Sequence, residues 1–498
     1  MASELSLFLA NEAAMARLGV DLALALKAGD LIALSGDLGS GKTTLARALI
    51  RAMADDDRLE VPSPTFTLVQ AYDTRVPIHH FDLYRLSDPQ ELEELGLPEA
   101  LETGAALIEW AERAELPSGA VTVKIEHEGE GRRVTIRGVG PTFERIMRSL
   151  EIRGFLAGHG WGDAERRYLL GDASARAYET VHLPGERERI VMNSPPLVPG
   201  PPVRDGKPYA VIAHTAQTVS AFVSIGYVLR NAGFAAPEIY ASDLEKGFLL
   251  IEHLGRGTFL EEGAPVRERY EAAARLLADL HRHEWPTQIE ADGAKHVIPV
   301  FDRDAMLIET GLLIEWYLPY VTGTPASDTL RDDFEALWNA ALDRIAGAET
   351  SLLMRDFHSP NIIWRAAKTG TDRMGILDFQ DSMIGPTAYD LASLAMDARV
   401  TISPEMELAT VDAYVKARAA AGSFDRDMFA FVYAMMAAHR NSKILGGFVR
   451  LDRRDGKPTY LKHLPRIRNY VRRALAHPGL SELRAFYEKN RLVSEDSA

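Results

Sequence analysis

The segment from Gly36 to Thr44 constrains the fold of this chain most, because it matches the phosphate-binding pattern G-x-x-x-x-G-K-[ST]. It follows the apolar run Leu31–Ser35 and precedes a helical stretch, which is the strand, loop and helix order that the pattern requires. Glycines allow backbone N–H groups to curl around phosphate, and the lysine reaches the terminal phosphates. The nucleotide-binding residues predicted by this pattern are Gly36, Asp37, Leu38, Gly39, Ser40, Gly41, Lys42, Thr43 and Thr44, and the Thr43 hydroxyl is a predicted magnesium ligand.

The composition limits what else the chain can be. With 498 residues it is too long for one ordinary core, so we expect two large domains or about three average ones. A formal charge of -15 argues against general nucleic-acid binding, and the lack of cysteine excludes disulfides and thiolate metal sites. The first residues form no apolar leader, and the uncharged stretch 209–229 is too polar for a membrane span. We therefore expect a cytoplasmic protein that does not enter a membrane.

A domain boundary is expected near residue 140. Two alternating runs, Val121–His127 and Arg133–Arg137, surround a turn and predict a β-hairpin, and a helical pattern begins at Thr142. Before the boundary, apolar runs alternate with helical stretches, which predicts a parallel sheet with helices on its faces. Residues 1–140 are therefore predicted to form an α/β P-loop NTPase domain.

The remainder, residues 141–498, is expected to form an α+β domain with two lobes. Strand signals come first and helical signals dominate afterwards. The strand signals lie at 167–183, 189–192 and 248–252. Prolines crowd the segment 195–202 and exclude a helix interior there. We place a β-rich small lobe at about 150–255 and an α-rich large lobe at about 256–498.

Two carboxylates in the first domain follow apolar runs that would lie beside the phosphate loop. Asp82 follows Ile78–Phe81 and Glu109 follows Ala105–Ile108, so both would emerge at the carboxyl ends of strands. Hydrolysis of a nucleotide needs carboxylates that bind the metal ion and position water. We therefore predict that Asp82 and Glu109 are site residues of a hydrolase.

Four segments of the first domain occur in the order and spacing of a known family. They are the phosphate loop, Ser63–Thr67, His80–Arg85 and Glu109–Trp110. Residues 1 to about 140 resemble the TsaE family, the ATPase of the bacterial machinery that puts threonylcarbamoyl on the adenosine next to the anticodon of certain tRNAs. The resemblance implies ATP and magnesium as cofactors, with Thr43, Asp82 and Glu109 at the metal ion and Glu109 as a catalytic residue. It also implies that Thr65 lies in a nucleotide-sensing loop, that the other subunits of the modification complex are partners, and that tRNA is contacted only indirectly.

A second set of polar residues lies in two loops of the large lobe. Asp356 and Asn361 precede the apolar run Ile362–Trp364, and Asp378 follows Ile376 and Leu377. Phosphoryl transfer to a hydroxyl needs a carboxylate that accepts the proton, an Asn that binds metal, and an Asp that holds metal on the nucleotide. We predict Asp356 as the catalytic base and Asn361 and Asp378 as metal ligands.

These two loops carry a further resemblance. Asp356–Asn361 and Ile376–Asp381 are similar to the D-x-H-x-x-N and I-D-F-x-D loops of aminoglycoside phosphotransferase-like kinases. Additional matching segments are Gly171–Tyr178, Val191–Pro196 and Gly385–Ser393. With them, residues from about 150 to 490 resemble the AmgK-type anomeric sugar kinases, which phosphorylate N-acetylmuramate and N-acetylglucosamine in cell-wall recycling. The resemblance implies a protein-kinase-like phosphotransferase fold, ATP and magnesium as cofactors, and an amino sugar as substrate.

The chain departs from the kinase pattern at three positions. Met354 replaces the His that is usual two residues before the catalytic Asp, which we interpret as a packing substitution. The second strand, Ile190–Asn193, lacks the expected lysine, and the helix after it lacks a glutamate to pair with that lysine. Because both partners are missing together, we expect a different arrangement around the phosphates. Arg176 is either a nucleotide-binding residue in that arrangement or a surface arginine.

Three functional interpretations follow from the sequence. The first is a bifunctional enzyme with two independent ATP sites, in which a cut near Pro141 should give two soluble fragments. The second treats the kinase-like domain as an inactive binding module, against which the retention of Asp356, Asn361 and Asp378 speaks. The third keeps a kinase whose acceptor is choline, homoserine or another small alcohol.

Overall fold

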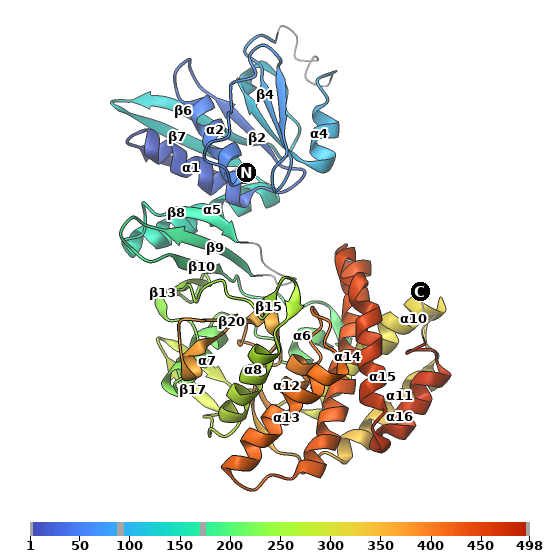
Figure 1. Ribbon diagram of the computed structural model, residues 1–498. Coiled ribbons are helices and arrows are strands. Elements are labelled where there is room, and N and C mark those ends of the chain that lie inside the picture. The colour runs from blue at the N-terminus through green and yellow to red at the C-terminus, as the bar shows by residue number, and fades with distance from the viewer. Residues whose placement is uncertain (1–2, 87–93, 170–175, 495–498) are drawn as a thin grey trace. The chain divides into compact units, whose positions relative to one another are not determined.

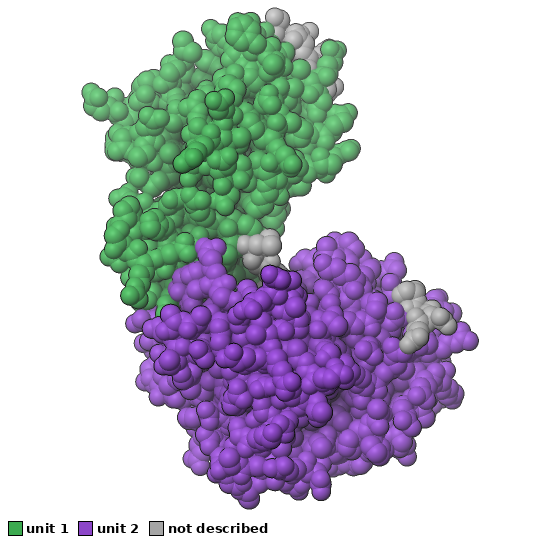
Figure 2. All heavy atoms as spheres, viewed as in Figure 1, with its two compact units in different colours: residues 1–194, 240–243, 248–252 green, residues 195–239, 244–247, 253–498 purple. Residues whose placement is uncertain are grey.

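The computed structural model of this protein describes residues 3–86, 94–169 and 176–494. The chain divides into two compact units, which Figure 2 colours green and purple. Unit 1 comprises residues 1–194, 240–243 and 248–252, and unit 2 comprises residues 195–239, 244–247 and 253–498. This division differs from the domain boundaries expected at about 140 and 255, which remain predictions.

A seven-stranded mixed sheet forms one layer of unit 1 (Figure 1). In the order of the sheet, its strands are β1 (Ser3–Leu9), β7 (Gly131–Gly138), β6 (Val121–Glu128), β2 (Leu31–Ser35), β5 (Ala105–Glu109), β4 (Ile78–Asp82) and β3 (Val69–Tyr72). The pairs β6–β2, β2–β5 and β5–β4 are parallel, as the sequence predicts. β7 and β3 run antiparallel to their neighbours because short turns, too short for a crossover helix, join β6 to β7 and β3 to β4.

Helices cover both faces of this sheet. α1 (Glu12–Ala25), α2 (Lys42–Ala54) and the first half of α5 (Gly140–Gly158) pack on one face, and α4 (Leu97–Thr103) packs on the other. Side chains of β2 alternate between the two cores, with Ile32 and Leu34 facing α1 and α2, and Leu31 and Ala33 facing α4. Burial on both faces requires a continuous apolar run, which is why this strand shows no polar alternation.

A second sheet of unit 1 has five strands. In order they are β13 (Ile239–Asp243), β14 (Phe248–Glu252), β10 (Arg189–Asn193), β9 (Ala177–His182) and β8 (Glu165–Leu169). The expected strand at 167–183 is thus two antiparallel strands, and residues 170–175 between them lie outside the described residues. The second half of α5 packs on this sheet, where Phe155 and Leu156 share a core with Val191 and Phe248.

Unit 2 is mostly helical, which agrees with the helical signals of the large lobe (Figure 1). Its helices are α6 (Tyr209–Ile212), α7 (Ser220–Asn231), α8 (Arg267–Leu280), α9 (Arg303–Leu312), α10 (Leu318–Thr322), α11 (Asp328–Asp343), α12 (Ala388–Ala395), α13 (Pro404–Ala421), α14 (Arg426–Asp455), α15 (Leu464–Leu475) and α16 (Ser481–Lys489). α14 packs against α9, α12 and α15. A Cβ on Gly446 of α14 would lie 2.1 Å from the Leu312 carbonyl oxygen, so a glycine is required for α14 and α9 to approach so closely. Among the described helices, none is long and apolar enough to cross a membrane.

Paired short strands complete unit 2. The pairs are β11 (Pro202–Arg204) with β12 (Lys207–Pro208), β15 (Leu260–Glu261) with β16 (Ala264–Pro265), β17 (Gln288–Ala291) with β18 (Ala294–Val297), β19 (Thr350–Leu353) with β22 (Met383–Pro386), and β20 (Ile362–Trp364) with β21 (Met374–Ile376). The last two pairs position the loops that contain Asp356 and Asp378, because β19 and β21 lead directly into them.

Candidate active sites

The phosphate loop of unit 1 connects β2 to α2, as its sequence pattern requires. Gly36 and Gly41 have φ angles of 139° and 112°, in the left-handed region that favours glycine. A Cβ on Gly36 would also lie 2.2 Å from the carbonyl oxygen of Ile125. The loop can therefore turn tightly against β6 only with glycine at this position.

Lys42 is the first residue of α2, and its side chain folds back over the loop. Its Nζ donates hydrogen bonds to the carbonyl oxygens of Gly36 (2.7 Å) and Asp37 (3.0 Å), and it lies 3.5 Å from the centroid of the Trp110 ring. Burial lowers the pKa of Lys42, although the charge of Glu109 acts in the opposite direction. The ammonium group is thus held at the position from which it can contact terminal phosphates.

Glu109 stands at the end of β5 and contacts two functional side chains. Its Oε2 accepts a hydrogen bond from the Thr43 hydroxyl at 2.8 Å, and its Oε1 lies 2.9 Å from Nε2 of His80. His80 and Glu109 are almost completely buried. His80 was not predicted as a site residue, although it begins the segment His80–Arg85 that carries the TsaE resemblance, and this was the available signal.

Asp82 lies beside Glu109, because the two are register partners in the parallel strands β4 and β5. Its carboxylate accepts hydrogen bonds from the Ser63 hydroxyl, from the Thr65 hydroxyl at 3.0 Å and from the backbone N–H of Tyr84 at 2.9 Å. Asp82 therefore links the segment Ser63–Thr67 to the end of β4. This link brings Thr65 to the nucleotide site, although no sequence pattern specifies that contact.

Most of the residues predicted for the first site line one pocket of about 420 Å³. Its lining comprises Leu38, Gly39, Gly41, Lys42, Thr43, Thr44, Ser63, Thr65, Asp82, Tyr84, Glu109 and Trp110. Gly36 and Asp37 are the hydrogen-bond acceptors of Lys42, and Ser40 lines a neighbouring pocket of about 220 Å³. The structure thus gathers a cation, hydroxyls and carboxylates around one phosphate-binding loop.

The predicted residues of the second site lie together in unit 2. Asn361 Nδ2 donates to the carbonyl oxygen of Asp356 (2.9 Å) and to Oδ2 of Asp378 (3.3 Å). The backbone N–H of Leu377 donates to the carbonyl oxygen of Asn361 at 2.9 Å, which ties the two loops together. Gln380 Nε2 donates to Asp378 Oδ1 at 2.8 Å, and Asp378 has a φ angle of 56°. This backbone conformation turns Asp378 toward Asn361 at a cost typical of functional sites.

Positive charge surrounds the carboxylate of Asp356, which is 42% exposed. Arg440 of α14 places a guanidinium nitrogen 3.6 Å from Asp356 Oδ1. Partial burial would raise the pKa of Asp356, but the charges of Lys443, Arg440 and His358 outweigh it and lower the pKa to about 2. Asp356 is therefore ionised at any physiological pH.

Buried carboxylates support the loop that contains Asp356. Asp390 accepts hydrogen bonds from the backbone N–H groups of Met354 (2.5 Å) and Arg355 (2.9 Å), and Asp397 accepts one from Ser359 (2.9 Å). Glu309 of α9 pairs with Arg355 and, at 2.9 Å, with Lys443. None of these carboxylates was predicted. Asp390 falls in the segment Gly385–Ser393 that carries the kinase resemblance, and this was the available signal.

The structure describes two residues that the sequence analysis discussed where the chain departs from the kinase pattern. Met354 is buried, with its sulfur 3.8 Å from the Ser382 hydroxyl, in agreement with a packing role. Arg176 precedes β9 in unit 1, whereas Asp356 and Asp378 belong to unit 2. A role of Arg176 in nucleotide binding therefore remains a prediction.

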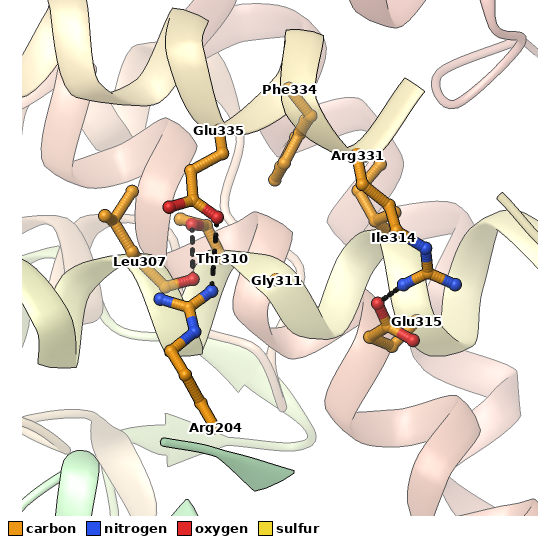
Figure 3. Close-up of a pocket in the computed structure, with 9 residues that line it drawn as sticks. All are labelled: Arg204, Leu307, Thr310, Gly311, Ile314, Glu315, Arg331, Phe334 and Glu335. Atoms are coloured by element: carbon orange, nitrogen blue, oxygen red, sulfur yellow. Dashed lines mark hydrogen bonds and ion pairs between the residues drawn. The ribbon is translucent and has the colours of Figure 1, made fainter. Parts of the chain in front are cut away.

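A small polar pocket of about 130 Å³ lies elsewhere in unit 2 (Figure 3). The ion pairs Arg204–Glu335 (3.3 Å) and Arg331–Glu315 cross it, and α9 contributes Leu307 and Thr310. None of Asp356, Asn361 and Asp378 lines this pocket. It is separate from the second candidate site, and no sequence pattern pointed to it.

Comparison with known proteins identifies a family for each part of the chain. Residues 9–135 match the family model of the threonylcarbamoyl adenosine biosynthesis protein TsaE, and residues 165–425 match the model of the phosphotransferase enzyme family. A TsaE protein of Rickettsia felis is 40% identical over 131 residues, which are 26% of this chain and 76% of that protein.

Relatives of the second part have a common description. An N-acetylmuramate/N-acetylglucosamine kinase of Caulobacter vibrioides is 34% identical over 347 residues, which cover 67% of this chain and 94% of that kinase. The protein of the same description from Pseudomonas aeruginosa is 31% identical and covers 65% of this chain and 89% of its own length. The chain therefore belongs to two families at once, as a P-loop ATPase of the TsaE family in its first part and an ATP-using enzyme of the phosphotransferase family in its second.

Proposed function

We propose that this chain is a bifunctional enzyme. Its first part hydrolyses ATP in support of tRNA threonylcarbamoylation, and its second part phosphorylates N-acetylmuramate and N-acetylglucosamine at the anomeric hydroxyl, for the recycling of cell-wall sugars. The observation that carries this proposal is that each of the two family matches contains its own set of converging site residues. Work on tRNA would place the chain in the cytoplasm.

In the first site, we assign ATP to the pocket around the phosphate loop. Thr43 and Glu109 would hold Mg²⁺, with Asp82 beside them, because hydroxyl and carboxylate oxygens are the ligands that Mg²⁺ prefers. Among the described residues, no group of three or more His, Asp or Glu side chains could hold a metal ion. That finding fits Mg²⁺, which usually takes one or two carboxylates and completes its shell with phosphate and water. Lys42 would contact the β- and γ-phosphates.

The catalytic role that we assign to Glu109 is to orient the attacking water. Its carboxylate is fixed by Thr43 on one side and His80 on the other, so little reorganisation is needed when ATP binds. The partners would be the other subunits of the threonylcarbamoylation complex, and tRNA would be contacted only through them. The TsaE relatives support this assignment by their description as tRNA threonylcarbamoyladenosine biosynthesis proteins.

In the second site, Asp356 would orient the sugar hydroxyl and accept its proton. The hydroxyl oxygen forms a bond to the γ-phosphorus of ATP, the bond to the bridging oxygen breaks, and ADP leaves. Asn361 and Asp378 would hold Mg²⁺, which neutralises charge on the phosphates when it is bound. A pKa of about 2 makes Asp356 a weak base, which suits a loose transition state in which the proton leaves late.

Two measurements test the sugar-kinase assignment. The first is ATP consumption with a panel of amino sugars, for the intact chain and for Asp356→Ala, with Asp343→Ala as a control because Asp343 is 69% exposed and pairs only with Arg303 among the contacts described. Activity should disappear in Asp356→Ala alone. The second is the position of the phosphate, which should be acid-labile and show coupling between the anomeric proton and phosphorus in NMR spectra. Phosphate on a ring or exocyclic hydroxyl would overturn the anomeric assignment, and transfer to no acceptor would favour an inactive binding module.

A further inference from the structure

One helix of unit 1 belongs to two hydrophobic cores. The first half of α5 places Phe143 and Ile146 in the core that contains α1, α2 and the seven-stranded sheet. The second half places Phe155 and Leu156 in the core of the five-stranded sheet, with Trp161 after the helix. Because α5 is continuous from residue 140 to 158, one helix contributes side chains to both cores and joins them covalently.

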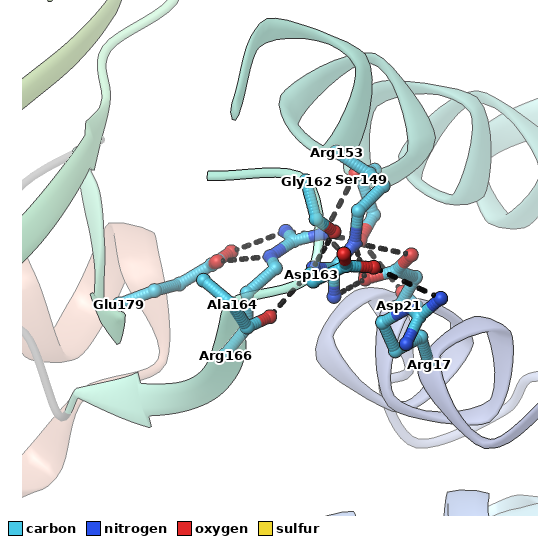
Figure 4. A network of polar contacts seen from close by, with 9 residues as sticks. All are labelled: Arg17, Asp21, Ser149, Arg153, Gly162, Asp163, Ala164, Arg166 and Glu179. Carbon is cyan, nitrogen blue, oxygen red and sulfur yellow. Dashed lines mark hydrogen bonds and ion pairs between the residues drawn. The ribbon is translucent and has the colours of Figure 1, made fainter. Parts of the chain in front are cut away.

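A buried ion-pair network joins the same elements (Figure 4). Asp21 on α1 contacts Arg153 on α5 at 2.8 Å and Arg166 on β8 at 2.7 Å. Arg166 also forms two hydrogen bonds to Glu179 on β9, at 2.7 and 2.9 Å. The hydroxyl of Ser149 on α5 donates to the carbonyl oxygen of Asp21 at 2.6 Å. The network therefore connects the family-matched ATPase segment to the first two strands of the family-matched kinase segment.

The charges in this network compensate each other away from solvent. The side chain of Arg166 is 0% exposed, that of Asp21 is 3% exposed and that of Glu179 is 9% exposed. Two arginines face two carboxylates, so the network is neutral only while all four side chains stay together. Separating α1 from β8 would leave charges without their partners, which is strongly unfavourable at buried positions.

The network is also connected to the nucleotide site through the packing of α1 on α2. A Cβ on Gly19 of α1 would lie 2.7 Å from the Cβ of Ala48 and 3.0 Å from the carbonyl oxygen of Leu45, both on α2. α1 therefore packs directly on the helix whose first residue is Lys42. Asp21 follows Gly19 by two positions, so the contact with α2 and the contact with β8 are made by one turn of α1.

We propose that the P-loop domain, α5 and the five-stranded sheet open as one cooperative unit, so that nucleotide bound at the phosphate loop stabilises the sheet of the kinase. The proposal rests on the proposed function in that nucleotide binds at the phosphate loop, and its test also uses the role proposed for Asp378. No change of shape is required. A ligand that binds only the closed form lowers the population of every opening that breaks its site, by the factor one plus the ratio of ligand concentration to Kd.

Amide hydrogen exchange of the full chain tests this coupling. The chain should carry Asp378→Ala, which weakens nucleotide binding in the second site, and the probe is Mg²⁺–ADP at 100 times its Kd. Exchange in α2 and in β9 and β10 should slow by the same factor, roughly 100-fold. With Lys42→Ala added, Mg²⁺–ADP should slow exchange in neither segment. Slower exchange in α2 with no change in β9 and β10 would overturn the proposal.

Variants of the ion-pair network provide a second measurement. Asp21→Asn should reduce the protection that Mg²⁺–ADP gives to β9 and β10 while α2 stays protected. Asp163→Asn is the matched control, because Asp163 is 78% exposed and its pair with Arg17 (3.0 Å) lies at the edge of the same region (Figure 4). If Asp21→Asn does not fold, the proposal is still tested in the chain with native Asp21, by comparing the protection that Mg²⁺–ADP gives to α2 with the protection that it gives to β9 and β10. Protection in no segment would overturn the proposed ATPase site and this proposal with it, whereas protection of α2 alone would overturn only this proposal.

Discussion

The carboxylate of Asp390 accepts a 2.9 Å hydrogen bond from the backbone N–H of Arg355, the residue before the predicted catalytic base. Its other oxygen accepts from the N–H of Met354. Arg355 has a φ angle of 67°, an unfavourable conformation for a residue with a side chain, and Asp390 holds it there. The backbone that leads into Asp356 is thus held by a carboxylate outside the predicted set of site residues.

Replacing that carboxylate should disturb both stability and turnover. In Asp390→Ala two buried N–H groups lose their acceptor, and each costs about 1–3 kcal/mol. We expect a lower midpoint of thermal unfolding and at least a tenfold lower kcat for phosphoryl transfer. Asp390→Asn keeps one acceptor oxygen and should lose less of both. Equal behaviour of the two variants would show that the hydrogen bonds are not the cause.

Substitutions at Asp356 and Asp378 should have different kinetic effects. Asp356→Asn should lower kcat by roughly a hundred- to ten-thousand-fold with little change in ATP affinity, since this carboxylate acts on the acceptor hydroxyl. Asp378→Ala should weaken Mg²⁺-dependent ATP binding as well, because this carboxylate would hold the metal ion on the phosphates. Steady-state kinetics together with calorimetric titration of the nucleotide separates the two. The same loss of ATP affinity in both variants would contradict these roles.

The pH dependence of phosphoryl transfer follows from the charge around Asp356. Its pKa is lowered from 3.8 to about 2, so the carboxylate stays ionised as the pH falls through the range where an ordinary Asp takes up a proton. We expect no loss of kcat attributable to Asp356 above a pH of about 4. In Arg440→Met, one of the charges that lower this pKa is removed, and an acidic limb should move toward higher pH. If the pH profile of kcat is unchanged in Arg440→Met, the charge of Arg440 is not a cause of the lowered pKa of Asp356.

Lys42→Ala should abolish ATP hydrolysis by the first site and the support of tRNA modification. Phosphoryl transfer by the second site should remain nearly intact at saturating ATP, because Lys42 and Asp356 belong to different units. The control is Lys124→Ala, which changes a lysine that is 54% exposed on β6. Assays of both reactions on the same preparation would reveal a shared site if the two activities fell together.

His439 should make stability depend on pH. It is completely buried, its Nε2 lies 2.8 Å from the carbonyl oxygen of Met306, and burial lowers its pKa from 6.5 to about 4. Because the unfolded chain takes up this proton at a higher pH than the folded chain, the stabilisation is complete above pH 6.5 and is lost as the pH falls toward 4. The full difference corresponds to about 3 kcal/mol.

His439→Phe isolates this contribution. Phenylalanine can keep the edge-to-face contacts that His439 makes with Phe301 and Trp338, but it cannot titrate. Urea unfolding between pH 7.5 and 4 should show a smaller loss of stability in the variant than in the native chain. If the native chain and the variant lose the same amount of stability between pH 7.5 and 4, another group causes the acid sensitivity.

A cut through the start of α5 should not release a stable ATPase fragment, contrary to the expectation from sequence of two soluble fragments from a cut near Pro141. Phe143 is 7% exposed and Ile146 is 0% exposed, and a fragment that ends at residue 139 lacks both. Their burial contributes about 1.5–3 kcal/mol each. A fragment that ends at residue 158 keeps both side chains, and thermal unfolding of the two should show the longer one to be more stable. Equal stability would restore the earlier expectation.

The parts of the site that could be predicted are those in which chemistry depends on neighbours along the chain. The phosphate loop is such a case, because its glycines, Lys42 and Thr43 act within one turn between a strand and a helix. Asp356 and Asn361 are another, since five positions separate the two roles. Strand ends identified Asp82 and Glu109, because parallel strands in α/β sheets place their carboxyl ends at the same edge.

The contacts of the supporting residues could not be predicted, because their partners are remote in sequence. His80 lies 29 positions from Glu109 and Asp390 lies 35 positions from Arg355, and no local pattern marks either pair. The strand expected at 167–183 is two strands, and Gly171 within that stretch was a turn signal that the expectation did not use. Local periodicity indicates which residues face a core, but it does not indicate which other segment packs against those residues.

By itself, the amino-acid sequence determined that this chain combines domains of two nucleotide-using families, because the motifs of both families are short, local and required by specific chemistry. Only the tertiary structure decided where one folding unit ends and the next begins. The sequence changes character near residue 140, but α5 begins at that point and buries Phe143 in one core and Phe155 in the other. Asp21 and Arg166 are ordinary charged residues in the sequence. They become a buried pair only because burial and charge compensation depend on which surfaces meet in three dimensions.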